Sequence, residues 1–109
     1  MNNRSKGRAG EEYASAMLES KGYRIYDRNY STAFGEIDII AVKGRCIHFV
    51  EVKARGRVDC GYPSEAVDRR KQSRIRRVAE YYIRSKHLAG YDVCFDVAEV
   101  WFNLIEDCY

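Results

Sequence analysis

The chain has 109 residues, of which 46% are hydrophobic and 32% charged, as is typical of one water-soluble globular domain spanning residues 1–109. No apolar run approaches the roughly 20 residues that a membrane-spanning helix requires. No apolar signal segment follows the basic start MNNRSKGR, so we expect a cytoplasmic protein that makes no contact with a membrane.

The hydrophobic pattern predicts a first helix over about residues 6–21, because Ala14 and Leu18 repeat at helical spacing. Gly22 fits the end of this helix, since glycine readily adopts the backbone conformation that terminates helices. Residues 23–30, YRIYDRNY, then predict a strand.

Residues 35–55, GEIDIIAVKGRCIHFVEVKAR, predict a β-hairpin with its turn near residues 43–45. Ile37 and Ile39 are expected on one face of the hairpin and Ile40 on the other. Because both faces are mostly apolar, we expect both to be covered by other elements.

A second helix is predicted from the N-cap residue Asp68 to about Lys86, with apolar residues repeating along one face. A strand-like run follows at residues 91–100, and a shorter run at 101–105 is a further candidate. The order α-β-β-β-α-β predicts an α/β fold in which helices flank a small mixed sheet.

Three charged residues interrupt the apolar hairpin: Asp38 in its first strand, and Glu51 and Lys53 in its second. A two-residue loop at 43–44 would make Asp38 and Glu51 diagonal neighbours, and a four-residue loop at 43–46 would oppose them directly. Both registers put the three side chains on one face, whereas a three-residue loop would separate the carboxylates.

Two carboxylates about 4.5–8 Å apart repel each other unless a cation lies between them. Mg²⁺ prefers oxygen ligands and often takes one or two protein carboxylates, with water and substrate phosphate in the other positions. The amine of Lys53 would position or deprotonate an attacking water there, or neutralise developing charge. This set suits phosphodiester hydrolysis; the alternative is solvated strand ends with surface salt bridges.

Glu11 shares with Ala14 and Leu18 the face of the first helix that packs inward. A carboxylate beside such a face needs a partner, which a metal-bound water would supply. The alternative is a carboxylate stabilised by the dipole at the helix N-terminus.

Four segments resemble, in order, the YraN-like family of small bacterial proteins: GEIDIIA (35–41), FVEVKAR (49–55), AVDRRKQSRIRR (66–77) and FDV (95–97). That family is related to the PD-(D/E)XK nuclease superfamily, near the archaeal Holliday-junction resolvases, and the resemblance covers about residues 7–102. It implies a restriction-endonuclease-like core and a metal-dependent endonuclease that hydrolyses DNA phosphodiester bonds, with branched DNA a candidate substrate.

The resemblance also implies a role for each residue of the hairpin site. Asp38 and Glu51 would bind Mg²⁺ or Mn²⁺ together with the carbonyl of Val52, and Lys53 would be the catalytic lysine. Ile37 stands where the superfamily's name has proline, at a position that varies.

Further positions follow from the same resemblance. Glu11 would match the glutamate of the first helix, and Gln72 the polar residue that assists the site. Independently of the resemblance, strand geometry leads us to expect that Glu36 points away from Asp38 and pairs with an arginine such as Arg28. Asp96 fits either a site residue or a structural carboxylate.

Residues 69–77, RRKQSRIRR, hold six basic residues and no acidic one, which leaves about −3 on the remaining residues since the whole chain carries +3. A phosphate backbone would relieve this repulsion, so we expect contacts to DNA phosphates rather than to bases; a solvated helix is the alternative. The predicted nucleic-acid-binding residues are Arg69, Arg70, Lys71, Arg74 and Arg77.

Two other functions stay open: a non-catalytic nucleic-acid-binding accessory protein on a nuclease-like fold, and an interaction domain for an acidic partner. Cleavage of a junction would require a homodimer with two symmetric sites. Most of the nine tyrosines, including Tyr13, Tyr23 and Tyr82, are interpreted as core packing rather than base-stacking platforms.

The cysteines predict free thiols in a reducing compartment. They form no Cys-x-x-Cys pair, although zinc sites usually take ligands at such short spacing, and the two histidines offer little support for a histidine-based metal cage. The four positions are Cys46, Cys60, Cys94 and Cys108.

Overall fold

The computed structural model describes residues 3–56 and 68–102, and within them the expected α-β-β-β-α-β order is confirmed. The two closing strand-like runs form one strand as far as Phe102; residues 103–105 lie outside the described residues. The elements are α1 (Asn3–Ser20), β1 (Arg24–Thr32), β2 (Gly35–Lys43), β3 (Cys46–Gly56), α2 (Arg69–Ser85) and β4 (Asp92–Phe102).

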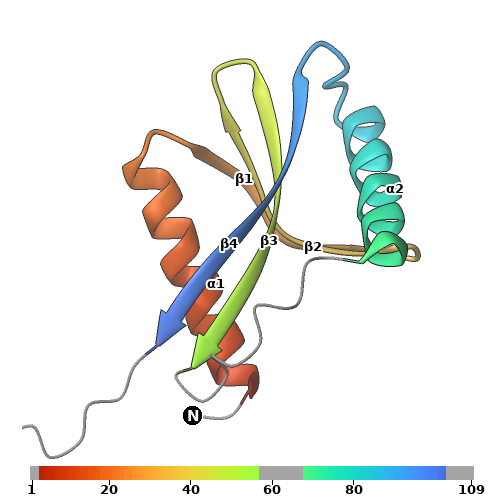
Figure 1. Cartoon of the computed structure of the whole chain (residues 1–109). Helices are drawn as coiled ribbons and strands as arrows, with labels where there is room; N and C mark the ends of the chain where they lie inside the picture. Colours follow the sequence, from red (N-terminus) through yellow and green to blue (C-terminus); the bar gives the residue numbers. More distant parts are fainter. Residues whose placement is uncertain (1–2, 57–67, 103–109) are drawn as a thin grey trace, which may run out of the picture.

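The four strands form one mixed sheet in the order β1-β2-β3-β4. The pairs β1–β2 and β2–β3 are antiparallel, and β4 lies parallel to β3 after the chain has crossed over through α2 (Figure 1). The β2–β3 hairpin turns at Gly44 and Arg45, where Gly44 has a φ of +61° that favours glycine. The turn is therefore where the sequence predicts it.

Both helix boundaries predicted from local signals are present. After α1, the N–H of Tyr23 donates to the carbonyl of Leu18 across Gly22, which has a φ of +92°. At the start of α2, Asp68 Oδ1 accepts the backbone N–H of Lys71 at 2.8 Å, as an N-cap carboxylate does.

The helices cover opposite faces of the sheet, on the two sides seen in Figure 1. The apolar alternation of β2 and β3 divides their side chains between two cores, as expected. One core, under α1, holds Ala14, Leu18, Ile39, Ala41, Val50 and Val100. The other, under α2, holds Ile37, Ile40, Val42, Ile47, Phe49, Val78, Ala79 and Tyr82.

Two packing expectations are wrong. Ile37 packs under α2 and not with Ile39, because the β2–β3 ladder ends at the Ile39–Val50 pair and the alternation does not continue past it. Tyr13 is 65% exposed, whereas Tyr82 is buried as expected. No helix of the described segments is long and apolar enough to cross a membrane.

Helix α1 approaches β3 closely at Gly10, where an added Cβ would lie 2.9 Å from the Cβ of Ala54. Gly7, one turn earlier, has open space around it. We expect Gly7→Ala to raise the free energy of unfolding by about 0.5–1 kcal/mol through helix propensity. We expect Gly10→Ala to lower it by about 1 kcal/mol or more, because the helix must move away. Urea unfolding of both variants tests this, and equal effects would contradict the close approach.

Candidate functional site

The candidate site begins where β2 and β3 separate. The ladder pairs Lys43 with Cys46 and ends at Ile39 and Val50, a register that puts Asp38 opposite Glu51. The loop is the two residues Gly44 and Arg45, one position beyond the two-residue loop at 43–44, and its register is the one expected from a four-residue loop at 43–46. Beyond the last pair, the Val52 N–H donates to Asp38 Oδ2 at 2.8 Å, so the carboxylate takes the place of a backbone acceptor.

The two carboxylates face one pocket of about 230 Å³ between the sheet and α2. Acidic residues of the sheet and basic residues of α2 meet there. The residues that line the pocket are Gly35, Glu36, Asp38, Glu51, Lys71, Arg74 and Ile75.

Glu51 is held by two lysines. Its Oε1 accepts a hydrogen bond from Lys71 Nζ at 2.5 Å and lies 3.7 Å from Lys53 Nζ, while only 12% of the Glu51 side chain is exposed. Burial alone would lower the pKa of Lys71, but its hydrogen bond to Glu51 and the negative charge of that group raise it instead. Lys71 is thus held in its charged form beside Glu51, the carboxylate that is expected to bind a metal.

Asp38, in contrast, is held by the backbone N–H of Val52. Burial raises its pKa to about 6, the Val52 N–H opposes that rise, and the nearby charges of Glu51, Glu11 and Glu36 add to it. Three carboxylates, those of Glu36, Asp38 and Glu51, therefore line one pocket together with Lys71 and Arg74. Hard oxygen donors in this state fit a divalent cation such as Mg²⁺ or Mn²⁺.

Removing the charge of Asp38 is expected to stabilise the metal-free protein. The pKa of about 6 lies above its ordinary value of 3.8, so the folded chain holds this proton more tightly than the unfolded chain. The ionisation of Asp38 therefore costs no stability below about pH 4, an increasing amount up to about pH 6, and a constant amount above it. The cost is at most about 3 kcal/mol, which solvent screening lowers to about 1–2 kcal/mol.

The variant for this test is Asp38→Asn, since an amide oxygen still accepts the Val52 N–H. Thermal unfolding of both proteins in chelator, from about pH 4 to about pH 8, should show the variant gaining stability over wild type as the pH rises. A constant difference across this range would show that Asp38 carries no raised pKa.

The other predicted residues lie around this pocket at different distances. Glu11 is half-buried on α1 and near enough to raise the pKa of Asp38. Gln72 lines a second pocket of about 400 Å³ that shares Glu51 and Ile75 with the first. Gln72 therefore lies in the pocket next to the carboxylate site and does not line the carboxylate pocket itself.

The predicted nucleic-acid-binding residues of α2 lie in three different surroundings. Lys71 and Arg74 line the carboxylate pocket, whereas Arg69 and Arg70 are exposed at the start of the helix. The guanidinium of Arg77 lies 4.2 Å from the ring centre of Phe34, in the β1–β2 turn.

One expectation about the acidic residues is wrong. Glu36 lines the same pocket as Asp38 and forms no ion pair with Arg28 within the described segments. Glu36 and Asp38 therefore face the same pocket. Asp96 does not join them: its Oδ2 lies 2.6 Å from His48 Nδ1.

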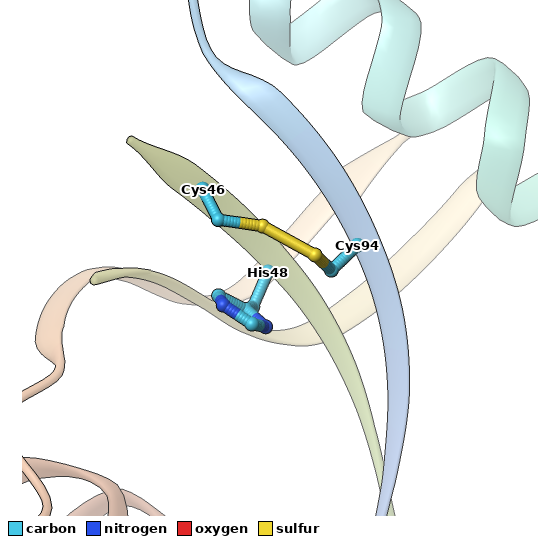
Figure 2. A group of neighbouring side chains, drawn as sticks. All are labelled: Cys46, His48 and Cys94. Atoms are coloured by element: carbon cyan, nitrogen blue, oxygen red, sulfur yellow. A yellow bond between two sulfur atoms is a disulfide. The ribbon is translucent and has the colours of Figure 1, made fainter. Parts of the chain in front are cut away.

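A second cluster, not predicted from the sequence, is formed by Cys46, His48 and Cys94 (Figure 2). Cys46 and Cys94 form a disulfide, so the expectation of free thiols is wrong for this pair; Cys60 and Cys108 lie outside the described residues. The available signal was the spacing Cys46-x-His48 in one strand and Cys94-x-Asp96 in another, since residues two apart in a strand lie on one face. Its meaning depends on the pairing of β3 with β4.

The model of the uncharacterised protein family UPF0102 matches residues 10–100. A UPF0102 protein of Alkaliphilus metalliredigens is 54% identical over 97 residues, which cover 89% of this chain and 85% of the relative. One of Moorella thermoacetica is 48% identical over 103 residues, with 94% and 86% covered. The chain therefore belongs to family UPF0102, the YraN-like family that its four segments resemble.

Proposed function

We propose that this protein is a metal-dependent endonuclease that hydrolyses phosphodiester bonds of DNA, with branched DNA as the candidate substrate. The observation that carries the proposal is that Asp38 and Glu51 line one pocket, with Lys53 beside Glu51. The resemblance to the PD-(D/E)XK nucleases supports it, because their chemistry uses the same three residue types in this order along the chain.

The residues of the pocket divide the expected chemistry among them. Asp38, Glu51 and the Val52 carbonyl would hold Mg²⁺ or Mn²⁺, which when bound supplies charge stabilisation to a phosphate and lowers the pKa of water. The amine of Lys53 would hold or receive a proton of the attacking water at Nζ. The guanidinium of Arg74, in the same pocket, would bind a phosphate oxygen.

DNA would reach this pocket along the start of α2. Arg69 and Arg70 are exposed there and are free to contact phosphates beside the scissile one. Glu11 and Gln72 would complete the site from α1 and from the neighbouring pocket. A four-way junction would require two copies of the chain, since each copy brings one such pocket to one strand.

One observation favours the second candidate, a nucleic-acid-binding accessory protein without catalysis. Lys71 Nζ already satisfies Glu51 Oε1 at 2.5 Å, and an ammonium in this place can substitute for a metal. The two functions therefore differ in one measurable property, namely whether a divalent cation binds at Glu51.

The experiment combines metal binding with cleavage. Mn²⁺ is titrated calorimetrically into wild type, Glu51→Ala and the control Glu80→Ala. In the wild type, the carboxylate of Glu80 pairs with Arg84 at the surface of α2. All three are then incubated with labelled duplex, single-stranded and four-way-junction DNA. The nuclease proposal expects uptake and cleavage by wild type and by the control, both lost in Glu51→Ala.

Other outcomes favour the other functions. DNA binding that is lost in high salt and in Arg70→Ala with Arg74→Ala, without Mn²⁺ uptake or cleavage, would support the accessory protein. The absence of both metal uptake and DNA binding would leave the acidic-partner interaction domain.

A further inference from the structure

The second cluster lies on the α1 side of the sheet and is built by two neighbouring parallel strands. His48 of β3 pairs with Cys94 of β4, and Cys46 precedes His48 by two residues on the same face. One ligand atom from each residue lies within 4.8 Å of the others, and all three residues are half-buried. Figure 2 shows the His48 ring beside the Cys46–Cys94 bridge.

The His48 ring is fixed by its surroundings. Asp96 Oδ2 lies 2.6 Å from Nδ1, and the Tyr23 ring meets the imidazole edge-on with ring centres 5.0 Å apart. A carboxylate that holds one ring nitrogen leaves the other, Nε2, free to act as an acceptor. This is the arrangement by which proteins orient a metal-ligating histidine.

We propose that Cys46, His48 and Cys94 bind a zinc-like divalent cation once their disulfide is reduced, at a site separate from the carboxylate pocket. Two thiolates and one imidazole are the ligands that Zn²⁺ prefers over Mg²⁺ or Mn²⁺. Sulfurs bound to one zinc at about 2.3 Å each lie roughly 3.8 Å apart in a tetrahedron, a separation within the span of the cluster. Water would fill the fourth position, and Asp96 would position His48.

Reduction of the disulfide comes before metal binding. A dithiol reductant gives two electrons and two protons to the Cys46–Cys94 bond and becomes a disulfide itself. The two thiols then release their protons when the cation binds both sulfurs. The oxidised cluster has no thiolate to offer, so disulfide formation and metal binding exclude each other.

The probe is Co²⁺, which gives an intense thiolate-to-metal absorption band only when cysteine sulfur binds it. The full chain is reduced with a phosphine, freed of metal and titrated with Co²⁺ without oxygen, followed by Zn²⁺. We expect one equivalent of Co²⁺ to produce the band and Zn²⁺ to remove it. The oxidised wild type should give no band, a comparison that needs no substitution.

Variants then assign the ligands. Cys94→Ser should abolish the band, whereas Cys60→Ser combined with Cys108→Ser, the matched control, should keep it. Asp96→Asn should lower the Co²⁺ affinity about 10–100-fold while keeping the band. Glu51→Gln should leave the Co²⁺–thiolate band unchanged, which separates this site from the proposed nuclease pocket. No band in the reduced wild type, or a band that survives Cys94→Ser, would overturn the proposal.

Discussion

Replacing Lys53 with methionine is expected to lower the rate of DNA cleavage by at least about a hundredfold, the usual contribution of a positioned proton-transfer group. Lys53 Nζ lies 3.7 Å from Glu51 Oε1 and its side chain is mostly buried, so its amine stays beside the carboxylates. Methionine keeps the length of the side chain and removes the charge. Single-turnover cleavage of a four-way junction in Mn²⁺ measures the effect.

The control for this prediction is Lys43→Met, at the far end of the same hairpin, where the lysine contacts the ring of Tyr23. It should cleave at the wild-type rate. Calorimetry should show that Lys53→Met still binds Mn²⁺, because Asp38 and Glu51 remain. Full cleavage by Lys53→Met would show that the lysine serves only as an ion-pair partner of Glu51.

The elements of the fold follow from signals that lie within a few residues of each other. Gly22 and Gly44 mark chain reversals because they adopt positive φ, and Asp68 caps α2 through its own carboxylate. The alternation in β2 and β3 indicates a sheet covered on both faces. Since each of these signals is local, the sequence alone predicts them.

The arrangement of the two sites depends on contacts between distant residues. The sequence left two registers open for Asp38 and Glu51, and only the β2–β3 pairing chooses between them. The Cys46–Cys94 contact spans a sequence separation of 48 and arises from the parallel register of β3 and β4. Hydrophobic patterns do not encode a parallel register, which explains why this cluster was missed.

The direction in which Lys71 points from α2 also depends on contacts between distant residues. Its position in a run of basic residues predicts a DNA contact, yet the packing of Val78 and Tyr82 against the sheet turns Lys71 toward Glu51. The same helix thus presents one cation to a carboxylate and its neighbours to solvent. Charge composition identifies a basic helix but not the rotation of that helix about its axis.

The contact between Lys71 and Glu51 leads to a prediction for the variant Lys71→Met. Without the ammonium, the mostly buried carboxylate of Glu51 keeps only the more distant Lys53, so the metal-free protein should lose about 1–2 kcal/mol of stability. For a domain of this size, that loss corresponds to a Tm lower by roughly 5–10 °C.

Because the divalent cation no longer competes with Lys71 for Glu51, adding Mn²⁺ should raise the Tm of Lys71→Met more than that of wild type. Arg70→Met, which removes a neighbouring exposed charge, should match wild type with and without Mn²⁺. If Mn²⁺ raises the Tm of wild type and of Lys71→Met by the same amount, the ammonium and the metal do not share a position. The carboxylate pocket would then hold both at once, as a catalytic site with an additional lysine.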